Sequence, residues 1–335
     1  MSANDYLRDA TIRHEIGLHG LASGTVRKVL GLLAAGEKDL EAQIRRRLSW
    51  IADRGYDASD FTLRRLEANL LEIRKALREA YQAAGRELRS DLKALAGDES
   101  GFQTSLLSSA LPAEIRSAIS IIKPAAAELG AIVESRPFQG ALLKDWARQL
   151  EQSAYTKVRG AVRHGMLLGE SIDNIVRRVR GTKAQGFRDG VLAISRREAE
   201  TVVRTAVSHV AASVKDDVMA ANADILRGVV WLGTLDTRTC PVCGIRDGKL
   251  YTATDHRPID HGIPWGAGPG RMHMQDRCTS LPQLKSLREL GFNAEDYPPA
   301  TRASMNGQVS DRLDFAEWVK TQTAEVQAKV AKARR

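Results

Sequence analysis

The sequence predicts a mainly α-helical protein with a small α+β module near its C-terminal end, and three observations support this fold class. Apolar residues recur at three- and four-residue steps through most of residues 4–227. After residue 228 the chain changes to β-branched and aromatic residues, tight turns and Pro/Gly-rich loops. All three cysteines lie within 240–278. We therefore expect an extended helical N-terminal arm, a helical middle, a zinc-knuckle-like β-hairpin module and a C-terminal helix.

Two long amphipathic helices are expected in the N-terminal arm, residues 1–96. Segments 25–51 and 61–97 both place apolar residues at helical spacing. In the first segment these residues are Val26, Val29, Leu30, Leu33, Leu40, Ile44, Leu48 and Ile51. Charged residues alternate densely on the opposite faces, which favours a coiled-coil-like hairpin over a compact globule.

A linker with short helices is expected over 97–140, followed by a longer helical region. Residues 97–112 contain Gly, Ser and Pro without periodicity, so we predict a loop there. Helical spacing returns at 141 and leads to a short helix that Ser171 can cap and Gly181 can end. The clearest helix is predicted over 195–227, before Gly228 stops it.

The small module is expected over 229–282, within a domain that we place at 141–335. Its predicted parts, in chain order, are a strand at 229–236, a turn at Asp247-Gly248, a returning strand at 249–252, a loop at 254–271 and a short strand at 278–281. Asp314 and Glu317 then form a candidate capping box that opens a helix predicted to run to residue 335.

The charge of the chain favours a polyanionic partner. The 335 residues carry a formal net charge of +9, and residues 144–204 contain 13 Lys/Arg against 7 Asp/Glu, which gives +6 there. Such a basic region attracts phosphates without sequence preference and in a salt-dependent way. A solvated helical surface is the alternative explanation of the same charges. The DNA-contact candidates are Arg177, Arg178, Arg180, Lys183, Arg196 and Arg197.

Composition also indicates the compartment. The N-terminal residues contain no apolar stretch of the signal-peptide kind, and later apolar runs are interrupted before they reach membrane-spanning length. Three cysteines confined to one region argue against a secreted disulfide scaffold. We therefore expect a soluble protein in a reducing cytosol, with no membrane partner.

Cys240, Cys243, His273 and Cys278 form a candidate metal site. A C-x-x-C turn directs two thiolates at one ion, and an imidazole with a third sulfur completes a tetrahedral set that suits Zn²⁺. Asp276 is the alternative fourth ligand. The site is expected to be structural, because protein ligands fill the coordination sphere and leave no place for an activated water. One alternative is that these residues simply belong to a hairpin and bind no metal. A second is that Cys240 and Cys243 form a redox pair, but this is less favoured because no helix pattern begins at the cysteines.

Five motifs follow one another along the chain: GESIDNIVRRVRG (169–181), REAETVVRTAVSHVAAS (197–213), WLGTLDTRTCPVCGIRDGKLY (231–251), HMQDRCTSLP (273–282) and FAEWVKTQ (315–322). In sequence and in order they resemble the Mu F-like head-morphogenesis family, the minor head proteins of tailed bacteriophages. Asp276 departs from the family, which commonly has a cysteine at that position, and this departure slightly favours Cys278 as the ligand. The resemblance covers residues 134–322.

The resemblance implies a structural role in the virion and no enzymatic activity. Family members are minor capsid proteins that bind the portal and act in head assembly and in DNA packaging or ejection. The implied partners are the portal protein, with scaffold or major capsid protein as further candidates, and non-specific double-stranded DNA. The implied location is the head interior or portal vertex of the virion, and the host cytoplasm during assembly.

Two other functions fit parts of the sequence. The run DHGIPWGAG (260–268), close to the C-x-x-C pair, is similar to the centre of an HNH nuclease, with His261 as general base and a metal-held fold. The motif also has a downstream Asn, but no Asn occurs between Asn222 and Asn293, and a second C-x-x-C pair is missing. The other alternative is a DNA-binding adaptor unrelated to phage, which the charge alone would also explain.

Overall fold

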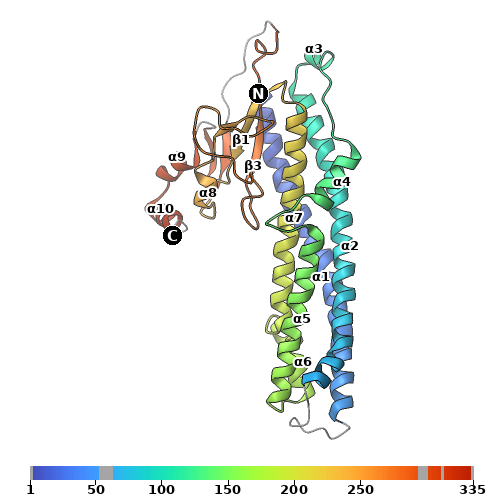
Figure 1. Cartoon of the computed structure of the whole chain (residues 1–335). Helices are drawn as coiled ribbons and strands as arrows, with labels where there is room; N and C mark the ends of the chain where they lie inside the picture. Colours follow the sequence, from blue (N-terminus) through green and yellow to red (C-terminus); the bar gives the residue numbers. More distant parts are fainter. Residues whose placement is uncertain (1–2, 53–62, 293–300, 311–312, 333–335) are drawn as a thin grey trace. The chain divides into compact units, whose positions relative to one another are not determined.

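The structure is a computed structural model that describes residues 3–52, 63–292, 301–310 and 313–332 (Figure 1). It confirms the mainly α class with a small antiparallel sheet near the C-terminal end. The chain divides into two compact units, and each unit is built from separate segments. Unit 1 comprises Met1–Leu21, Leu92–Gln139 and Thr205–Arg335, whereas unit 2 comprises Ala22–Asp91 and Gly140–Arg204. The sequence-based division into three domains, at 1–96, 97–140 and 141–335, stays a prediction. Its boundaries differ from those of the two units.

Helices α1 (Ala3–Ala52) and α2 (Leu63–Ala110) contribute residues to both units. The predicted pair of long helices is therefore confirmed, with residues 61 and 62 outside the described part of the chain. In unit 2 the two helices approach closely at Gly36, where a Cβ atom would clash with Ala80. Helix α2 continues to Ala110, so the loop predicted over 97–112 is wrong.

Unit 2 also contains α5 (Leu143–Leu167), α6 (Ile172–Arg180), the 3-10 turn η2 (Lys183–Gln185) and the first part of α7 (Val191–Ala221). Ser171 caps α6 as predicted, because its hydroxyl accepts a hydrogen bond from the Asn174 backbone N–H at 3.3 Å. Gly181 ends α6 with φ +91°, a conformation that favours glycine. At Gly165 in α5 a Cβ atom would clash with Ile175 of α6, which explains how closely these helices pack.

Unit 1 contains the remaining helices of the middle region, α3 (Ala113–Arg116), α4 (Ala126–Ser135) and the second part of α7. Helix α7 ends at Ala221, so the prediction that it reaches Gly228 is wrong. Asn222 directly follows the helix, and its side chain binds the backbone of Ile122: the amide oxygen accepts from the N–H at 2.7 Å and the amide nitrogen donates to the carbonyl at 2.9 Å.

The sheet of unit 1 has three antiparallel strands in the order β2-β1-β3, formed by β1 (Leu226–Leu232), β2 (Leu250–Tyr251) and β3 (Thr279–Leu284). The predicted strands at 229–236, 249–252 and 278–281 are thus confirmed with shifted ends. Gly248 makes the predicted turn with φ +75°, and its N–H donates to the Trp231 carbonyl at 2.9 Å. A second hairpin, β4 (Thr301–Ser304) and β5 (Gly307–Ser310), was not anticipated from the sequence.

The C-terminal segment forms two short helices, α9 (Phe315–Lys320) and α10 (Ala324–Lys332), where one continuous helix was predicted. The capping box is confirmed: Asp314 accepts from the Glu317 N–H at 2.8 Å, and Glu317 accepts from the Asp314 N–H at 3.2 Å. A small hydrophobic cluster, formed by Leu235, Phe315, Trp318 and Val330, holds these helices in unit 1. Residues 333–335 of the predicted helix lie outside the described part of the chain.

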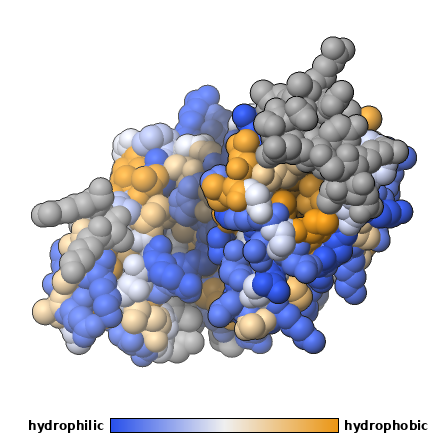
Figure 2. All heavy atoms as spheres, turned by 90° about the horizontal axis from the view of Figure 1, so that it is seen from below, coloured by the Kyte–Doolittle hydropathy of each residue, from blue (hydrophilic) through white to orange (hydrophobic). Residues whose placement is uncertain are grey.

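Hydrophilic residues cover most of the face shown in Figure 2, with separate hydrophobic patches between them. Among the large exposed apolar side chains are Leu167 and Leu168, at 67% and 62% exposure, where α5 ends. Within the described ranges, no helix is long and apolar enough to cross a membrane.

Candidate metal centre

The structure brings the predicted metal ligands together from two distant segments of unit 1. Cys240, Cys243 and His273 form one group of donor atoms, and Cys243, Asp276 and Cys278 form a second, with all atoms of each group within 4.8 Å of one another. Cys243 belongs to both groups, so the five side chains make one continuous cluster. We call these five residues the cysteine cluster. Within each group the donor atoms are close enough to share a metal ion, and Cys278 of the predicted set belongs to the second group.

The C-x-x-C segment begins a one-turn helix, α8 (Pro241–Gly244), so the expectation that no helix starts at the cysteines is wrong. Pro241 occupies the first helical position, where a missing N–H costs no hydrogen bond. Cys240 precedes it as the N-cap, and its sulfur accepts from the Cys243 N–H at 3.4 Å. This turn places both sulfurs on the same side. Cys243 is buried, whereas Cys240 is half-buried.

His273 reaches the cluster from the long Pro/Gly-rich segment. Its Nε2 lies 3.3 Å from Cys240 Sγ and 3.9 Å from Cys243 Sγ. In a tetrahedral zinc site, sulfur and nitrogen ligands stand about 3.6 Å apart, as follows from the usual metal–ligand lengths. Its Nδ1 lies 2.9 Å from the Met274 carbonyl and donates to it, so in the neutral imidazole Nε2 carries no proton and is available as a ligand.

Asp276 orders the backbone around Cys278. One carboxylate oxygen accepts from the Cys278 N–H at 3.0 Å, and the other accepts from the Met272 N–H at 3.1 Å. The same carboxylate also lies 3.9 Å from Cys243 Sγ. Asp276 is therefore close enough to act as a ligand, but its two backbone bonds also give it a positioning role. Cys278 and Asp276 are both buried.

The thiols have different proton affinities. The Cys278 S–H donates to Cys243, and this hydrogen bond lowers the pKa of Cys243 to about 7. The same hydrogen bond, with burial, raises the pKa of Cys278. Burial also raises the pKa of Cys240 to about 11. Burial opposes a charged His273, but the Met274 carbonyl and the Asp276 charge outweigh it and raise the pKa of this imidazole. Cys243 is thus the first thiolate of the cluster.

An ion pair that sequence reasoning missed supports the ligand-bearing strand. Arg277, between Asp276 and Cys278, donates to both carboxylate oxygens of Asp236, at 2.7 and 3.0 Å. Asp236 follows β1, so this pair links the two segments that carry the cysteines. The only signal in the sequence was the presence of opposite charges in both segments, and this did not reveal which residues pair.

The six DNA-contact candidates fall into two sets. The paired basic set, Arg178, Arg180 and Arg196, forms ion pairs within unit 2 with Glu170, Glu41 and Glu37. The exposed basic set, Arg177, Lys183 and Arg197, points its side chains into solvent. Since intrachain carboxylates already neutralise the paired set, the exposed set is the better candidate for phosphate contacts.

His261, the candidate nuclease base, has both ring nitrogens engaged by backbone groups. Nε2 donates to the Leu250 carbonyl at 2.8 Å, and Nδ1 accepts from the Ile263 N–H at 3.2 Å. Its ring also packs against Tyr251 in an edge-on arrangement with centroids 4.8 Å apart. In this arrangement backbone groups of the same chain occupy both ring nitrogens, whereas a general base needs a nitrogen that can reach the attacking water.

Neither models of known protein families, nor the curated proteins, nor the solved structures contain a match to this chain.

Proposed function

We propose that the chain is a minor head protein of a tailed bacteriophage, with a structural role at the portal and in DNA packaging or delivery. The observation that carries the proposal is the cysteine cluster, because its ligand types and spacing are those of the motifs that resemble the head-morphogenesis family. The engaged nitrogens of His261 favour this role over the nuclease.

The cysteine cluster would hold one structural Zn²⁺. Cys240, Cys243, His273 and Cys278 supply three sulfurs and one nitrogen, a set that zinc prefers among common divalent ions. The ion would join α8 to the segment just before β3, which carries His273 and Cys278. The loop between these two segments has few apolar residues. Its binding energy would then contribute directly to the folding of unit 1.

Portal association is the test that separates a head protein from a general DNA-binding adaptor. The full chain is co-expressed with the portal protein encoded in the same phage genome, and the portal oligomer is purified through its own tag. We expect the chain to co-elute at high salt, where phosphate-driven association is lost. Absence from the portal fraction at every salt concentration would contradict the proposal.

The nuclease alternative has a separate test. Supercoiled plasmid is incubated with the purified chain and Mg²⁺ or Mn²⁺, and nicking is followed on a gel. We expect no metal-dependent nicking. Nicking that disappears in the His261→Ala variant would overturn the non-enzymatic role.

DNA contact is tested by comparing the two basic sets. Replacing all three residues of the exposed basic set with Ala should reduce the slope of log affinity against log salt by about 2.7, which is about 0.9 for each phosphate that the chain no longer neutralises. The matched triple replacement in the paired basic set should leave this slope unchanged and lower thermal stability instead. Equal slopes for both triple variants and the natural chain would mean that the exposed set does not contact DNA.

A further inference from the structure

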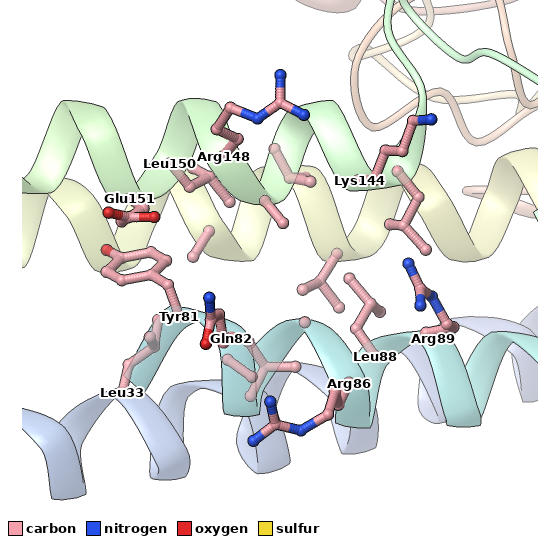
Figure 3. Close-up of a pocket in the computed structure, with 18 residues that line it drawn as sticks. Leu33, Tyr81, Gln82, Arg86, Leu88, Arg89, Lys144, Arg148, Leu150 and Glu151 are labelled. Atoms are coloured by element: carbon pink, nitrogen blue, oxygen red, sulfur yellow. The ribbon is translucent and has the colours of Figure 1, made fainter. Parts of the chain in front are cut away.

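Unit 2 contains a cavity of about 340 Å³ between helices α1, α2, α5 and α7 (Figure 3). Its wall is largely apolar and includes the buried side chains of Val29, Leu33, Leu88, Leu143, Val202 and Val203. This volume is in the range of pockets that hold small molecules, which are also mainly apolar with a few polar groups at defined places.

Small residues line part of the cavity. Ala84, Ala147 and Ala199 are among them. A Cβ atom on Gly85 of α2 would make ordinary van der Waals contact, at 3.6 Å, with the Cβ of Ala147 of α5, so the two helices approach closely at this point. The open volume therefore lies beside this contact, along the apolar side chains of the wall.

The charged groups around the cavity are mostly cationic. Arg86, Arg89, Lys144 and Arg148 line it, and the one acidic residue among its lining side chains is Glu151. Arg148 pairs with Asp145 at 3.4 Å. Glu151 already pairs with Arg78 at 3.5 Å. The balance of charge therefore favours an anionic group in the ligand.

The charges are also distributed unevenly along the cavity. Figure 3 shows Lys144 and Arg89 at one end, and Tyr81 and Glu151 at the other. Lys144 is exposed, and in the part of the chain that the structure describes no carboxylate pairs with it. One end is thus suited to an anion, whereas the interior is suited to an apolar chain.

The dimensions fit one extended acyl chain. Along α2 the lining residues run from Tyr81 to Arg89, and along α5 from Leu143 to Glu151. Eight residue steps correspond to about 12 Å of helix, at about 1.5 Å for each residue. An extended chain of about ten atoms has this length, as judged from the reach of an extended backbone. A partner helix, about 10 Å wide, would not fit the cavity.

We propose that this cavity binds a single-chain anionic amphiphile, a medium-chain fatty acid of the length of decanoate. Its carboxylate lies at the end marked by Lys144 and Arg89, and its acyl chain lies in the cavity against Leu88, Leu143 and Val203. This binding goes beyond the proposed head-protein function. It involves unit 2 and does not use the cysteine cluster, so either proposal can fail without the other.

Calorimetric titration of the full chain with decanoate, below the concentration at which it forms micelles, tests the proposal. We expect saturable binding at one site. Octanoate, which buries two fewer methylene groups, should bind about 15-fold more weakly. Decanol, which has the same chain but no charge, should bind at least about tenfold more weakly, because it loses the charge-assisted contact.

Two variants and a matched control locate the site. Lys144→Glu should weaken decanoate binding by about tenfold or more, whereas Lys38→Glu, the same charge change on the exposed face of α1, should leave it unchanged. Ala147→Phe should abolish binding by filling the cavity, with circular dichroism and thermal melting as the check on folding. The absence of saturable binding, equal affinities for decanoate and decanol, or equal effects of Lys144→Glu and Lys38→Glu would each overturn the proposal.

Discussion

Replacing His209 with Gln should make the protein more resistant to acid. His209 lies on α7 in unit 1, is 5% exposed, and packs beside Phe138 with ring centroids 5.4 Å apart. Burial, together with the nearby positive charges of Arg271 and Arg136, lowers the pKa of His209 from 6.5 to about 4. The protonated imidazole is therefore disfavoured in the folded chain.

The direction of the effect follows from proton uptake. Between pH 6.5 and 4 the unfolded chain binds a proton at His209, whereas the folded chain does not, so acid stabilises the unfolded state. The contribution of neutral His209 is fully present above pH 6.5 and is lost progressively as the pH falls toward 4. Each unit of pKa difference corresponds to about 1.4 kcal/mol. At pH 5 the natural chain should therefore have lost about 2 kcal/mol of unfolding free energy through this residue.

Urea unfolding of the natural chain and of His209→Gln at pH 7 and pH 5 measures this loss. The difference between the two pH values should be about 2 kcal/mol smaller in the variant. Any metal release in acid affects both proteins alike, because both keep the cysteine cluster. His164→Gln, at the exposed end of α5, is the matched control and should behave as the natural chain. Identical pH dependence in all three proteins would refute the reasoning.

Three further predictions concern the cysteine cluster and its surroundings. Cys243→Ser should remove bound zinc, measured by elemental analysis as a fall from one ion per chain to none, and lower the melting temperature as a chelator does to the natural chain. Asp276→Asn keeps one acceptor oxygen, so it should weaken zinc affinity by about 10- to 100-fold without abolishing binding; complete loss would make Asp276 a ligand. Gly244→Ala would place a Cβ atom 2.6 Å from the Phe315 ring and should cost about 1–3 kcal/mol in urea unfolding. Gly262→Ala, which meets nothing within 4 Å, is its control, and equal stability of both variants would contradict the packing.

The continuation of α2 shows why part of the fold could not be predicted. The periodic face continues past residue 97, but at this point polar residues occupy it: Glu99, Ser100 and Gln103 are all buried. The Glu99 carboxylate accepts from Gln103 at 2.7 Å and lies 2.5 Å from His14 Nε2. A reading based on apolar spacing cannot anticipate a buried polar face whose partner is 85 residues away in the sequence.

The cysteine cluster was more predictable because its signal is chemical and does not depend on hydrophobicity. Cysteine and histidine at such spacing usually indicate a metal site. The structure brings these side chains into two groups that share Cys243, namely Cys240, Cys243 and His273, and Cys243, Asp276 and Cys278. The sequence did not reveal the one-turn helix at Pro241, because cysteine is not among the usual N-cap residues. Nor could it show that Asp276 also holds backbone N–H groups, since this depends on the path of the loop.

The discontinuous make-up of unit 1 has a consequence for synthesis on the ribosome. Lys215 is buried, donates to Thr279 at 2.5 Å, and forms an ion pair at 3.0 Å with Glu15, near the start of the chain. The N-terminal residues can therefore make these contacts only after the last third of the polypeptide has left the ribosome, and only then can unit 1 finish folding. A fragment expressed from residue 141 onward would lack Glu15 and leave a lysine charge without its carboxylate, so it should depend on refolding aids that the full-length chain does not need.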